Sequence, residues 1–229
     1  MKRLSFSKVY VSIILVVYFS GCLIFQQRPD PRAPVEVTRQ EEIFFWEILD
    51  YRNSASGESI PQWLDYFLDG GIAAVEQLEE FENYYVFVSM NSGNNLNALE
   101  QWNTGFSPDL DFPRLAAVRI ENRFLHDARS YPDNEYGSYF LALIRSASDA
   151  LWQGAVRDGD FWLLRRFYDA DGVVLNWESY NYFILVKVER DVLTPQITTL
   201  LRDVRPEEPL STDQQRAVNR VVEQFFENF

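Results

Sequence analysis

The segment at residues 161–189 reads FWLLRRFYDADGVVLNWESYNYFILVKVE and contains two strand-like runs around a turn. Its aromatic and β-branched residues are typical of strands. The turn at residues 169–172 reads DADG, and an Asp-Gly pair between two such runs indicates a β-hairpin. We therefore predict strands over residues 161–168 and 180–189, with a further short β-prone piece at 173–177.

The last of these strands has an alternating pattern. Ile184, Val186 and Val188 share one face, because successive side chains of a strand point to opposite faces. Lys187 and Glu189 lie on the other face. The pattern predicts a sheet with one buried face and one face that is partly open to solvent.

Helical periodicity precedes and follows this segment. Thr38 and Glu41 have capping-box spacing ahead of an apolar run, which predicts that the folded part begins with a helix. Ser211 and Gln214 repeat this spacing before the last helix, whose apolar stripe ends at Phe229. We expect that stripe to dock on the protein's own domain, with another chain as the alternative. Helices are expected at residues 38–51, 61–68, 72–81, 96–102, 112–128, 135–153, 194–201 and 211–229, and a buried strand at residues 84–90.

This order of helices, a strand, two long helices, a strand meander and further helices predicts the α+β class. We expect a small, mainly antiparallel sheet with helices packed on one face. The sheet and helices are predicted to form a single domain over residues 41–229, which is long enough to bury a large hydrophobic core.

The first residues of the chain have the pattern of a targeting segment. Three basic residues precede an uncharged apolar run at residues 9–19. This run of eleven residues is shorter than the roughly 20 that a membrane-spanning helix needs. Two small residues and Cys22, the only cysteine in the chain, follow at once. The pattern predicts a signal peptide over residues 1–21.

The sequence Ser20-Gly21-Cys22 resembles the lipobox of bacterial lipoproteins, in which the signal peptidase cuts before the cysteine. Phe19 stands where Leu is common, which is similar to the looser lipoboxes of spirochaete-type lipoproteins. The resemblance implies that Cys22 is a lipidation site and that the domain lies outside the cytoplasm, held on the inner or outer membrane by acyl chains. The alternatives are an uncleaved anchor and an ordinary cleaved signal beside an incidental thiol.

Composition limits the partners of the exported chain. Residues 22–40 hold Cys22 and then Pro29, Pro31 and Pro34 among polar residues without a sustained period, and we expect a flexible tether there. Without the three basic residues of the leader, the chain has 21 − 3 = 18 basic and 34 acidic residues, a net charge of −16. This charge argues against nucleic acid as a partner. A single cysteine also leaves no intramolecular disulfide.

Residues 84–201 resemble the small α/β domain of bacterial secretory lipoproteins of the Lpp-twenty type. In that family a strand precedes Ala-rich helices, and the domain closes with a strand similar to residues 182–188, YFILVKV. The resemblance covers about half of the chain. It implies a fold and brings no catalytic residues with it.

The sequence offers few residues for catalysis or metal binding. His126 is the only histidine, so a zinc site built from several histidines is excluded, and a Ser-His-Asp site would depend on this residue. We expect His126 to lie at a helix edge, and we predict no catalytic residue, no metal site and no cofactor. A glycosidase would need two facing carboxylates, for which Asp158, Asp160 and Glu178 are candidates. Calcium at residues 169–172 is the alternative to the hairpin, but the glycine is fourth, whereas an EF-hand loop has it sixth.

Aromatic residues are abundant, with 6 Trp, 12 Tyr and 18 Phe. Most are expected in the core, while those with polar neighbours at residues 83–85 and 177–182 are also typical of protein and carbohydrate interfaces. We predict a membrane-anchored, exported lipoprotein that acts as a non-catalytic binding or structural component, with an envelope protein as a partner. The alternatives are a periplasmic hydrolase of envelope glycans and a carrier of a small apolar ligand.

Overall fold

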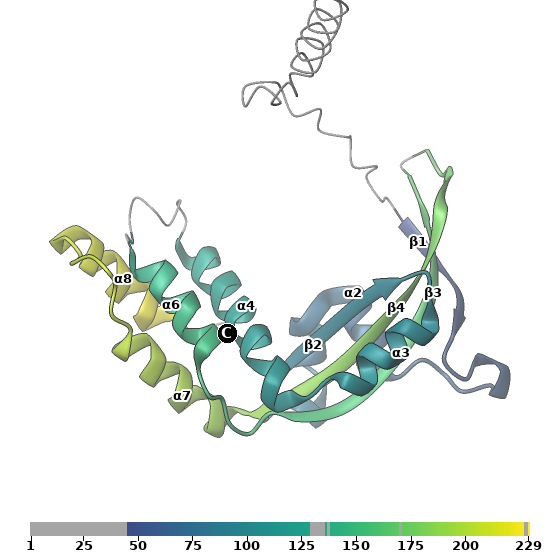
Figure 1. Cartoon of the computed structure of the whole chain (residues 1–229), viewed down its shortest axis with the longest axis horizontal. Helices are drawn as coiled ribbons and strands as arrows, with labels where there is room; N and C mark the ends of the chain where they lie inside the picture. The colour runs from purple at the N-terminus through teal and green to yellow at the C-terminus, as the bar shows by residue number, and fades with distance from the viewer. Residues whose placement is uncertain (1–44, 129–135, 137, 170, 227–228) are drawn as a thin grey trace, which may run out of the picture. The chain divides into compact units, whose positions relative to one another are not determined.

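The two strands predicted within residues 161–189 form the centre of an antiparallel sheet (Figure 1). The expectations for the signal peptide, for Cys22 and for the tether lie outside the part of the chain that the structure describes. The computed structural model describes residues 45–128, 136, 138–169, 171–226 and 229, without the side chains of residues 176 and 177.

The sheet has four strands in the order β1-β3-β4-β2, and all neighbouring strands are antiparallel. Strands β3 and β4 are therefore central, and β1 and β2 are the edge strands. The register of β2 against β4 runs without a shift from Tyr84 opposite Glu189 to Gly93 opposite Tyr180. The strands are β1 (Phe45–Tyr51), β2 (Tyr84–Gly93), β3 (Val156–Tyr168) and β4 (Val174–Glu189).

The turn between β3 and β4 is the predicted hairpin. The carboxylate of Asp169 accepts hydrogen bonds from the backbone N–H groups of Asp171, at 3.0 Å, and Val173, at 2.8 Å. Gly172 has a φ of 75°, which glycine adopts without steric cost. The acidic residue that would begin a calcium loop is thus used by the turn itself, and the hairpin prediction is confirmed.

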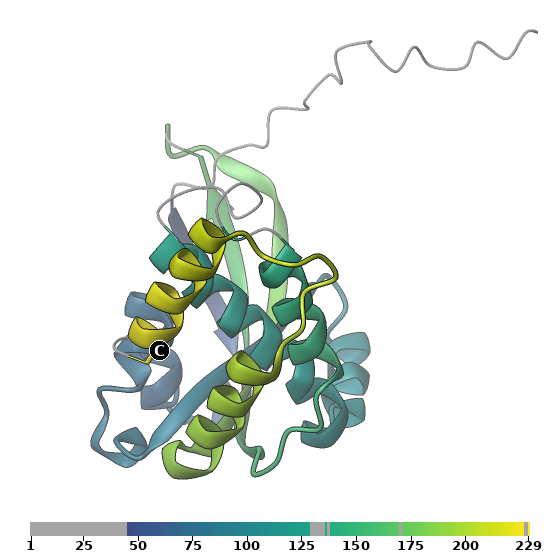
Figure 2. The ribbon, with the colours of Figure 1, turned by 90° about the vertical axis from the view of Figure 1, so that its left-hand side faces the viewer.

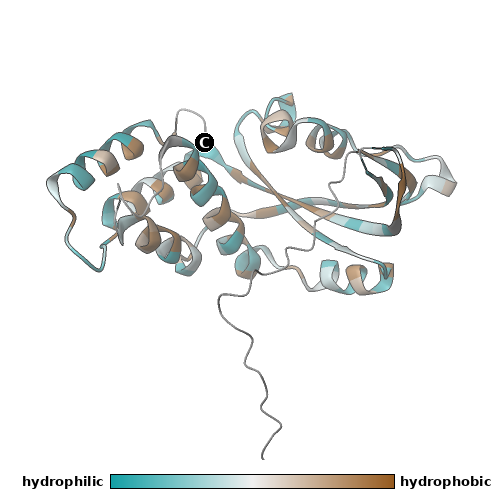
Figure 3. Ribbon diagram, turned by 90° about the horizontal axis from the view of Figure 1, so that it is seen from above, coloured by the Kyte–Doolittle hydropathy of each residue, from teal (hydrophilic) through white to brown (hydrophobic). Residues whose placement is uncertain are grey.

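The helices have the mixed hydrophobic and hydrophilic surfaces of amphipathic elements (Figure 3). Helix α2 is kinked at Gly71, whose φ of 68° and ψ of −160° are not helical, and this kink lies between the two helices predicted at residues 61–68 and 72–81. The helices are α2 (Gln62–Val75), α3 (Leu96–Gly105), α4 (Pro108–Ala128), α6 (Ser138–Asp149), α7 (Arg190–Asp203) and α8 (Thr212–Gln224), with 3-10 turns η1 (Ser54–Ser56) and η2 (Glu79–Phe81).

Helices cover both faces of the sheet. On one face Phe87, Ile184 and Val186 belong to a hydrophobic core shared with α4, α6, α7 and α8, and Figures 1 and 2 show these four helices gathered at one end of the sheet. On the opposite face Phe183 and Leu185 pack with residues of α2 and η2. The predicted α+β class is confirmed, and the face expected to be partly open to solvent is covered by α2.

The expectation of a first helix over residues 38–51 is wrong for its described part, because Phe45–Tyr51 is strand β1. Trp46 and Ile48 are apolar at a spacing of two, so the short run fits a strand as well as a helix. Exposure alternates along β1 as expected for an edge strand. Pairing with β3 is what makes this run a strand and not a helix.

Other helix boundaries differ from the predictions in smaller ways. The helix expected at residues 72–81 is divided between the end of α2 and η2. Helix α7 begins at Arg190, directly after β4, and contains Pro195, whereas its start was expected at Thr194. The described part of the helix expected at residues 135–153 is α6, Ser138–Asp149.

The last helix docks on its own domain, as predicted. The capping box of Ser211 and Gln214 is present at the start of α8. At its other end Arg123 of α4 donates hydrogen bonds to the backbone oxygens of Phe225, at 2.8 Å, and Gln224, at 2.9 Å. Phe225 and Phe229 are buried in the core that α8 shares with α4 and α6.

Candidate functional site

A groove of about 970 Å³ runs along the outer edge of β2, between α2 on one side and α4 on the other. We call it the edge groove. Strand β2 supplies its floor, because this strand has a neighbour in the sheet, β4, on one side only. The residues that line it include Ile72 and Glu76 of α2 and its C-cap, Val88 and Met90 of β2, and Arg114, Leu115, Val118 and Arg119 of α4.

The backbone of β2 turns alternate peptide groups toward the groove. In an antiparallel pair, every second residue directs its N–H and C=O away from the partner strand. Val86 is such a residue, since its N–H donates to Glu76 Oε1 at 2.7 Å and its C=O accepts from Arg119 Nη1 at 2.7 Å. The unbroken register places Val88 and Met90 in the same orientation.

The outward N–H and C=O groups of Val88 and Met90 have no hydrogen-bond partner within the described residues. At the next outward position, the N–H of Ser92 is bound by the side chain of Asn91 at 2.9 Å. The open part of the edge is therefore centred on Val88 and Met90. Unpaired backbone groups of this kind are the usual template for pairing with another strand.

Glu76 and Arg119 close one end of the open edge. Arg119 binds both carboxylate oxygens of Glu76, at 2.8 and 3.2 Å, and the two side chains are only 13% and 11% exposed. The guanidinium of Arg119 also lies over the rings of Tyr85, Phe87 and Phe229, at 4.6 to 5.2 Å from their centroids. The ion pair and the rings hold Glu76 and Arg119 in place. Their hydrogen bonds to the N–H and C=O of Val86 are therefore a fixed part of the domain.

The walls of the groove include apolar side chains that are partly open to solvent. Met90 is 52% exposed and Val118 is 48% exposed. Ile72, Val88 and Leu115 beside them are half-buried. Exposed apolar side chains grouped beside an unpaired strand edge are typical of a binding surface.

The α4 wall also carries positive charge. Arg114 is exposed on this wall and makes no ion pair among the residues that the structure describes. Of the two carboxylates of the lining, Glu76 binds Arg119, and Asp111 Oδ2 accepts the N–H of Ser107 at 2.8 Å. A cation therefore faces the groove in a chain whose net charge is −13.

His126 lies in the last turn of α4, is exposed and lines the groove. This agrees with the expected position at a helix edge. The lining contains no cysteine.

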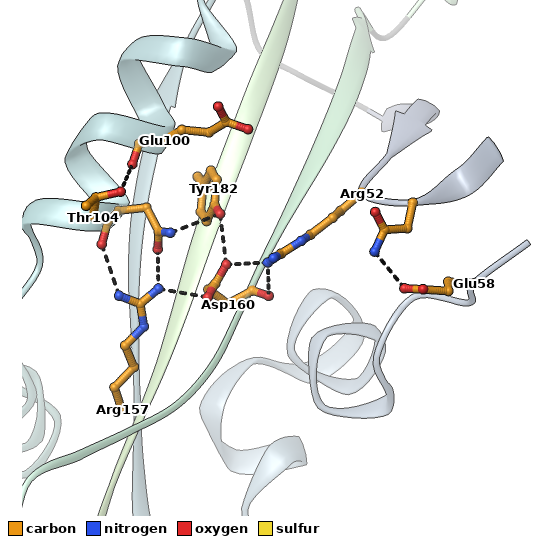
Figure 4. A network of polar contacts seen from close by, with 9 residues as sticks. Arg52, Glu58, Glu100, Thr104, Arg157, Asp160 and Tyr182 are labelled. Carbon is orange, nitrogen blue, oxygen red and sulfur yellow. Dashed lines mark hydrogen bonds and ion pairs between the residues drawn. The ribbon is translucent and has the colours of Figure 1, made fainter. Parts of the chain in front are cut away.

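The three acids considered for a glycosidase each pair with a cation. Asp158 binds Lys187 at 2.6 Å, and Glu178 binds Arg166 at 2.6 Å. Asp160 belongs to a network at the side of α3, shown in Figure 4, where it binds Arg157 and accepts the Tyr182 hydroxyl. None of the three lines the edge groove.

The Asp160 network favours the ionised carboxylate. Burial raises the pKa of Asp160, but hydrogen bonds from Tyr182 and Arg157 and the charges of Arg52 and Arg157 outweigh it and hold the pKa below its ordinary value. Burial and the Asp160 carboxylate raise the pKa of Tyr182 well above its ordinary range. A general acid would need a raised carboxyl pKa, so the arrangement suits an ion-pair network.

The aromatic residues with polar neighbours lie in strands. Tyr85 and Tyr182 are buried, at 5% and 3% exposure, and Tyr180 packs edge-on against Trp162. The expected core position is confirmed for Tyr85 and Tyr182, whereas Tyr180 is partly buried on the central strand β4. The side chain of Trp177 lies outside the described residues.

Three further observations concern the described part of the chain. Its acidic, histidine and cysteine side chains form no group of three or more suited to a metal ion. None of its helices combines the length and hydrophobicity needed to cross a bilayer. Cys22, the predicted lipidation site, lies outside it.

Comparison with known proteins returned no matching family model, no matching curated protein and no matching solved structure. The resemblances to the lipobox and to the Lpp-twenty type therefore stay predictions.

The groove residues were missed by the sequence analysis. The run at residues 84–90 predicts a buried strand, and the structure confirms the strand, but its place at an edge follows from strand order. The 52% exposure of Met90 is visible only in the structure, so no local signal in the sequence marks this strand as an edge.

Proposed function

We propose that this protein is an exported lipoprotein, anchored in the cell envelope through acylated Cys22, whose domain is a non-catalytic binding component that holds a partner protein in the edge groove. The observation that carries the binding role is the open edge of β2, with unpaired backbone at Val88 and Met90 between α2 and α4, whose groove-facing walls include exposed apolar side chains. Residues 22–40 would act as the tether between the lipid and the domain.

The membrane anchor is supported by the sequence. A basic start, a short apolar run and a lone cysteine directly after small residues fit a lipoprotein signal. Two or three acyl chains on Cys22 would hold the protein on the membrane essentially permanently. A binding domain on such an anchor has a fixed location and needs only a surface that its partner fits.

The groove favours a protein partner over the two alternatives. A small apolar ligand would fill an enclosed cavity, whereas this groove is open along a strand whose peptide groups need hydrogen-bond partners. A glycan hydrolase would need two facing carboxylates, and the acids considered for that role are paired with cations outside the groove.

Site-specific photo-crosslinking in intact cells tests the binding role. A photoreactive amino acid replaces Met90 in the full chain, and a matched variant carries it at Leu141 of α6, which is exposed to a similar degree, at 59% against 52%. We expect a discrete crosslinked protein from position 90 and none from position 141. Equal labelling at both positions, or no product at position 90, would reject the groove as the binding site.

Metabolic labelling with a fatty-acid analogue tests the anchor. We expect the wild type to take up label and to fractionate with membranes, and Cys22→Ala to lose both properties. A Cys22→Ala variant that stays in the membrane, together with an unlabelled wild type, would show that residues 9–19 are an uncleaved anchor.

A further inference from the structure

The open edge has the dimensions of a short strand-pairing site. Three outward positions, Val88, Met90 and Ser92, follow the capped position Val86 along β2. Five residues of strand, from 88 to 92, span about 16 Å at roughly 3.3 Å per residue. An incoming segment that pairs with this stretch would satisfy the N–H and C=O groups of Val88 and Met90.

The surroundings of the edge favour a single extended segment over a second copy of the domain. Helices α2 and α4 stand on the two sides of β2 and form the walls of the groove. A second copy that paired through its own β2 would bring its own α2 and α4 to the same place. A single extended segment brings no helices of its own to the groove, and we therefore infer that the occupant is one such segment.

Strand geometry assigns a chemistry to each face of the segment. Its side chains would point alternately to the α2 side and the α4 side of the sheet. On the α2 side they would meet Ile72 and the side chains of Val88 and Met90, which calls for apolar residues. On the α4 side they would meet Leu115, Val118 and Arg114.

Arg114 favours a negatively charged residue on the face of the segment that points toward α4. It lacks an ion-pair partner among the described residues, and Glu76, the other acid of the groove beside Asp111, is paired with Arg119. An Asp or Glu in the segment would supply the missing partner in a partly desolvated site, where such a pair adds specificity. A basic segment would instead leave Arg114 facing a like charge.

We propose that the partner binds by adding an extended segment to β2 as a further strand, with apolar residues facing α2 and an acidic residue facing Arg114. This inference rests on the proposed function and specifies the chemistry of its partner. It is the mode of recognition in which backbone hydrogen bonds supply affinity and alternate side chains supply specificity.

The probe for this proposal is a display library of short random peptides, selected on the purified full chain. We expect the enriched peptides to alternate apolar and other residues and to contain Asp or Glu. Met90→Pro removes one outward N–H, and proline at such an edge position keeps the pairing with β4. We expect it and Arg114→Glu each to weaken the selected peptides about tenfold or more, while the control Arg202→Glu, at an exposed arginine of α7, leaves binding unchanged.

Amide hydrogen exchange covers the case in which Met90→Pro does not fold. With the wild-type chain and a selected peptide, we expect the N–H groups of Val88 and Met90 to become protected. Peptides that bind without protecting these groups, peptides of basic composition, or a library without enrichment would each overturn the proposal.

Crosslinking separates this proposal from the proposed function. If Met90→Pro and Arg114→Glu lower the crosslinking yield of a photoreactive residue at position 118 in cells, strand addition is supported. If the partner still crosslinks there at full yield in both variants, the groove remains a binding site and strand addition with acidic recognition is rejected. A lack of crosslinks from the wild-type groove rejects the proposed function itself.

Discussion

Replacing Glu76 by alanine should destabilise the domain more than any ordinary surface change. The Glu76 carboxylate accepts from Arg119 at 2.8 and 3.2 Å and from the N–H of Val86 at 2.7 Å, and the two charged side chains are little exposed. Glu76→Ala would leave a nearly buried guanidinium without a carboxylate and a strand N–H without an acceptor. Breaking a buried pair in this way costs about 3–5 kcal/mol.

The structure indicates the lower end of that range. The side chains of Glu76 and Arg119 retain 11% and 13% exposure, and Arg190 approaches the same carboxylate at 3.6 Å from the solvent side. We therefore expect a loss of about 3 kcal/mol in the free energy of unfolding. For a domain of this size the loss corresponds to a fall of roughly 6–12 °C in Tm.

Urea unfolding of the purified full chain, followed by circular dichroism, measures this loss. Glu76→Gln keeps an oxygen for the N–H of Val86 and should cost less than Glu76→Ala. The matched control is Glu80→Ala in η2, at an exposed glutamate, which should change stability by less than about 0.5 kcal/mol. A loss below about 1 kcal/mol for Glu76→Ala would refute our account of the closed end of the groove.

Three further predictions concern the rest of the domain. Arg123→Met removes two charged hydrogen bonds to the end of α8 and should cost about 3 kcal/mol by urea unfolding. Ser211→Ala removes the capping box of α8 and should cost about 1 kcal/mol in the same assay. Since the folded pKa of Asp160 lies below its ordinary value of 3.8, the ionised carboxylate stabilises the fold above that pH. The stability difference between wild type and Asp160→Asn should therefore persist at neutral pH and shrink as the pH falls below 3.8.

Each of these predictions has a clear contrary result. An unchanged midpoint for Arg123→Met would mean that the end of α8 is held by its apolar contacts alone. Aspartate is also a good N-cap residue, so a Ser211→Ala variant as stable as Ser211→Asp would show that the N-cap side chain does not stabilise α8. If the difference in the free energy of unfolding between wild type and Asp160→Asn grew as the pH fell, the ionised Asp160 carboxylate would not be the stabilising form.

Local chemistry made much of this fold predictable. The hairpin at residues 169–172 depends on an aspartate that binds nearby N–H groups and a glycine with positive φ, both readable from sequence. The capping box at Ser211 is equally local. Each of these features is decided within a few residues, so no knowledge of distant contacts is needed.

The features that were missed depend on contacts between distant segments. Strand β1 was expected to be a helix, because its apolar residues fit both periods and only pairing with β3 separates the two. The cover of the second face by α2 was missed for the same reason, since Phe183 and Leu185 were not expected to meet Trp63 and Leu64.

The candidate site was the least predictable part. A strand lies at an edge when no second strand pairs with it, and the residue types of 84–93 carry no mark of that. The pairing of Arg119 with Glu76 spans 43 positions, and only the fold shows that Arg114 makes no ion pair among the described residues. The location of the protein, which the leader sequence predicts, stays a prediction.

The most direct test of the central claim needs no ligand. Amide hydrogen exchange of the free full chain is measured residue by residue along β2. We predict that the N–H groups of Val88 and Met90 exchange at least about a hundredfold faster than those of Phe87 and Ser89, which point toward β4. Equally slow exchange at all four positions would mean that the edge is already occupied in the free protein, and it would contradict the claim that β2 is open to a partner.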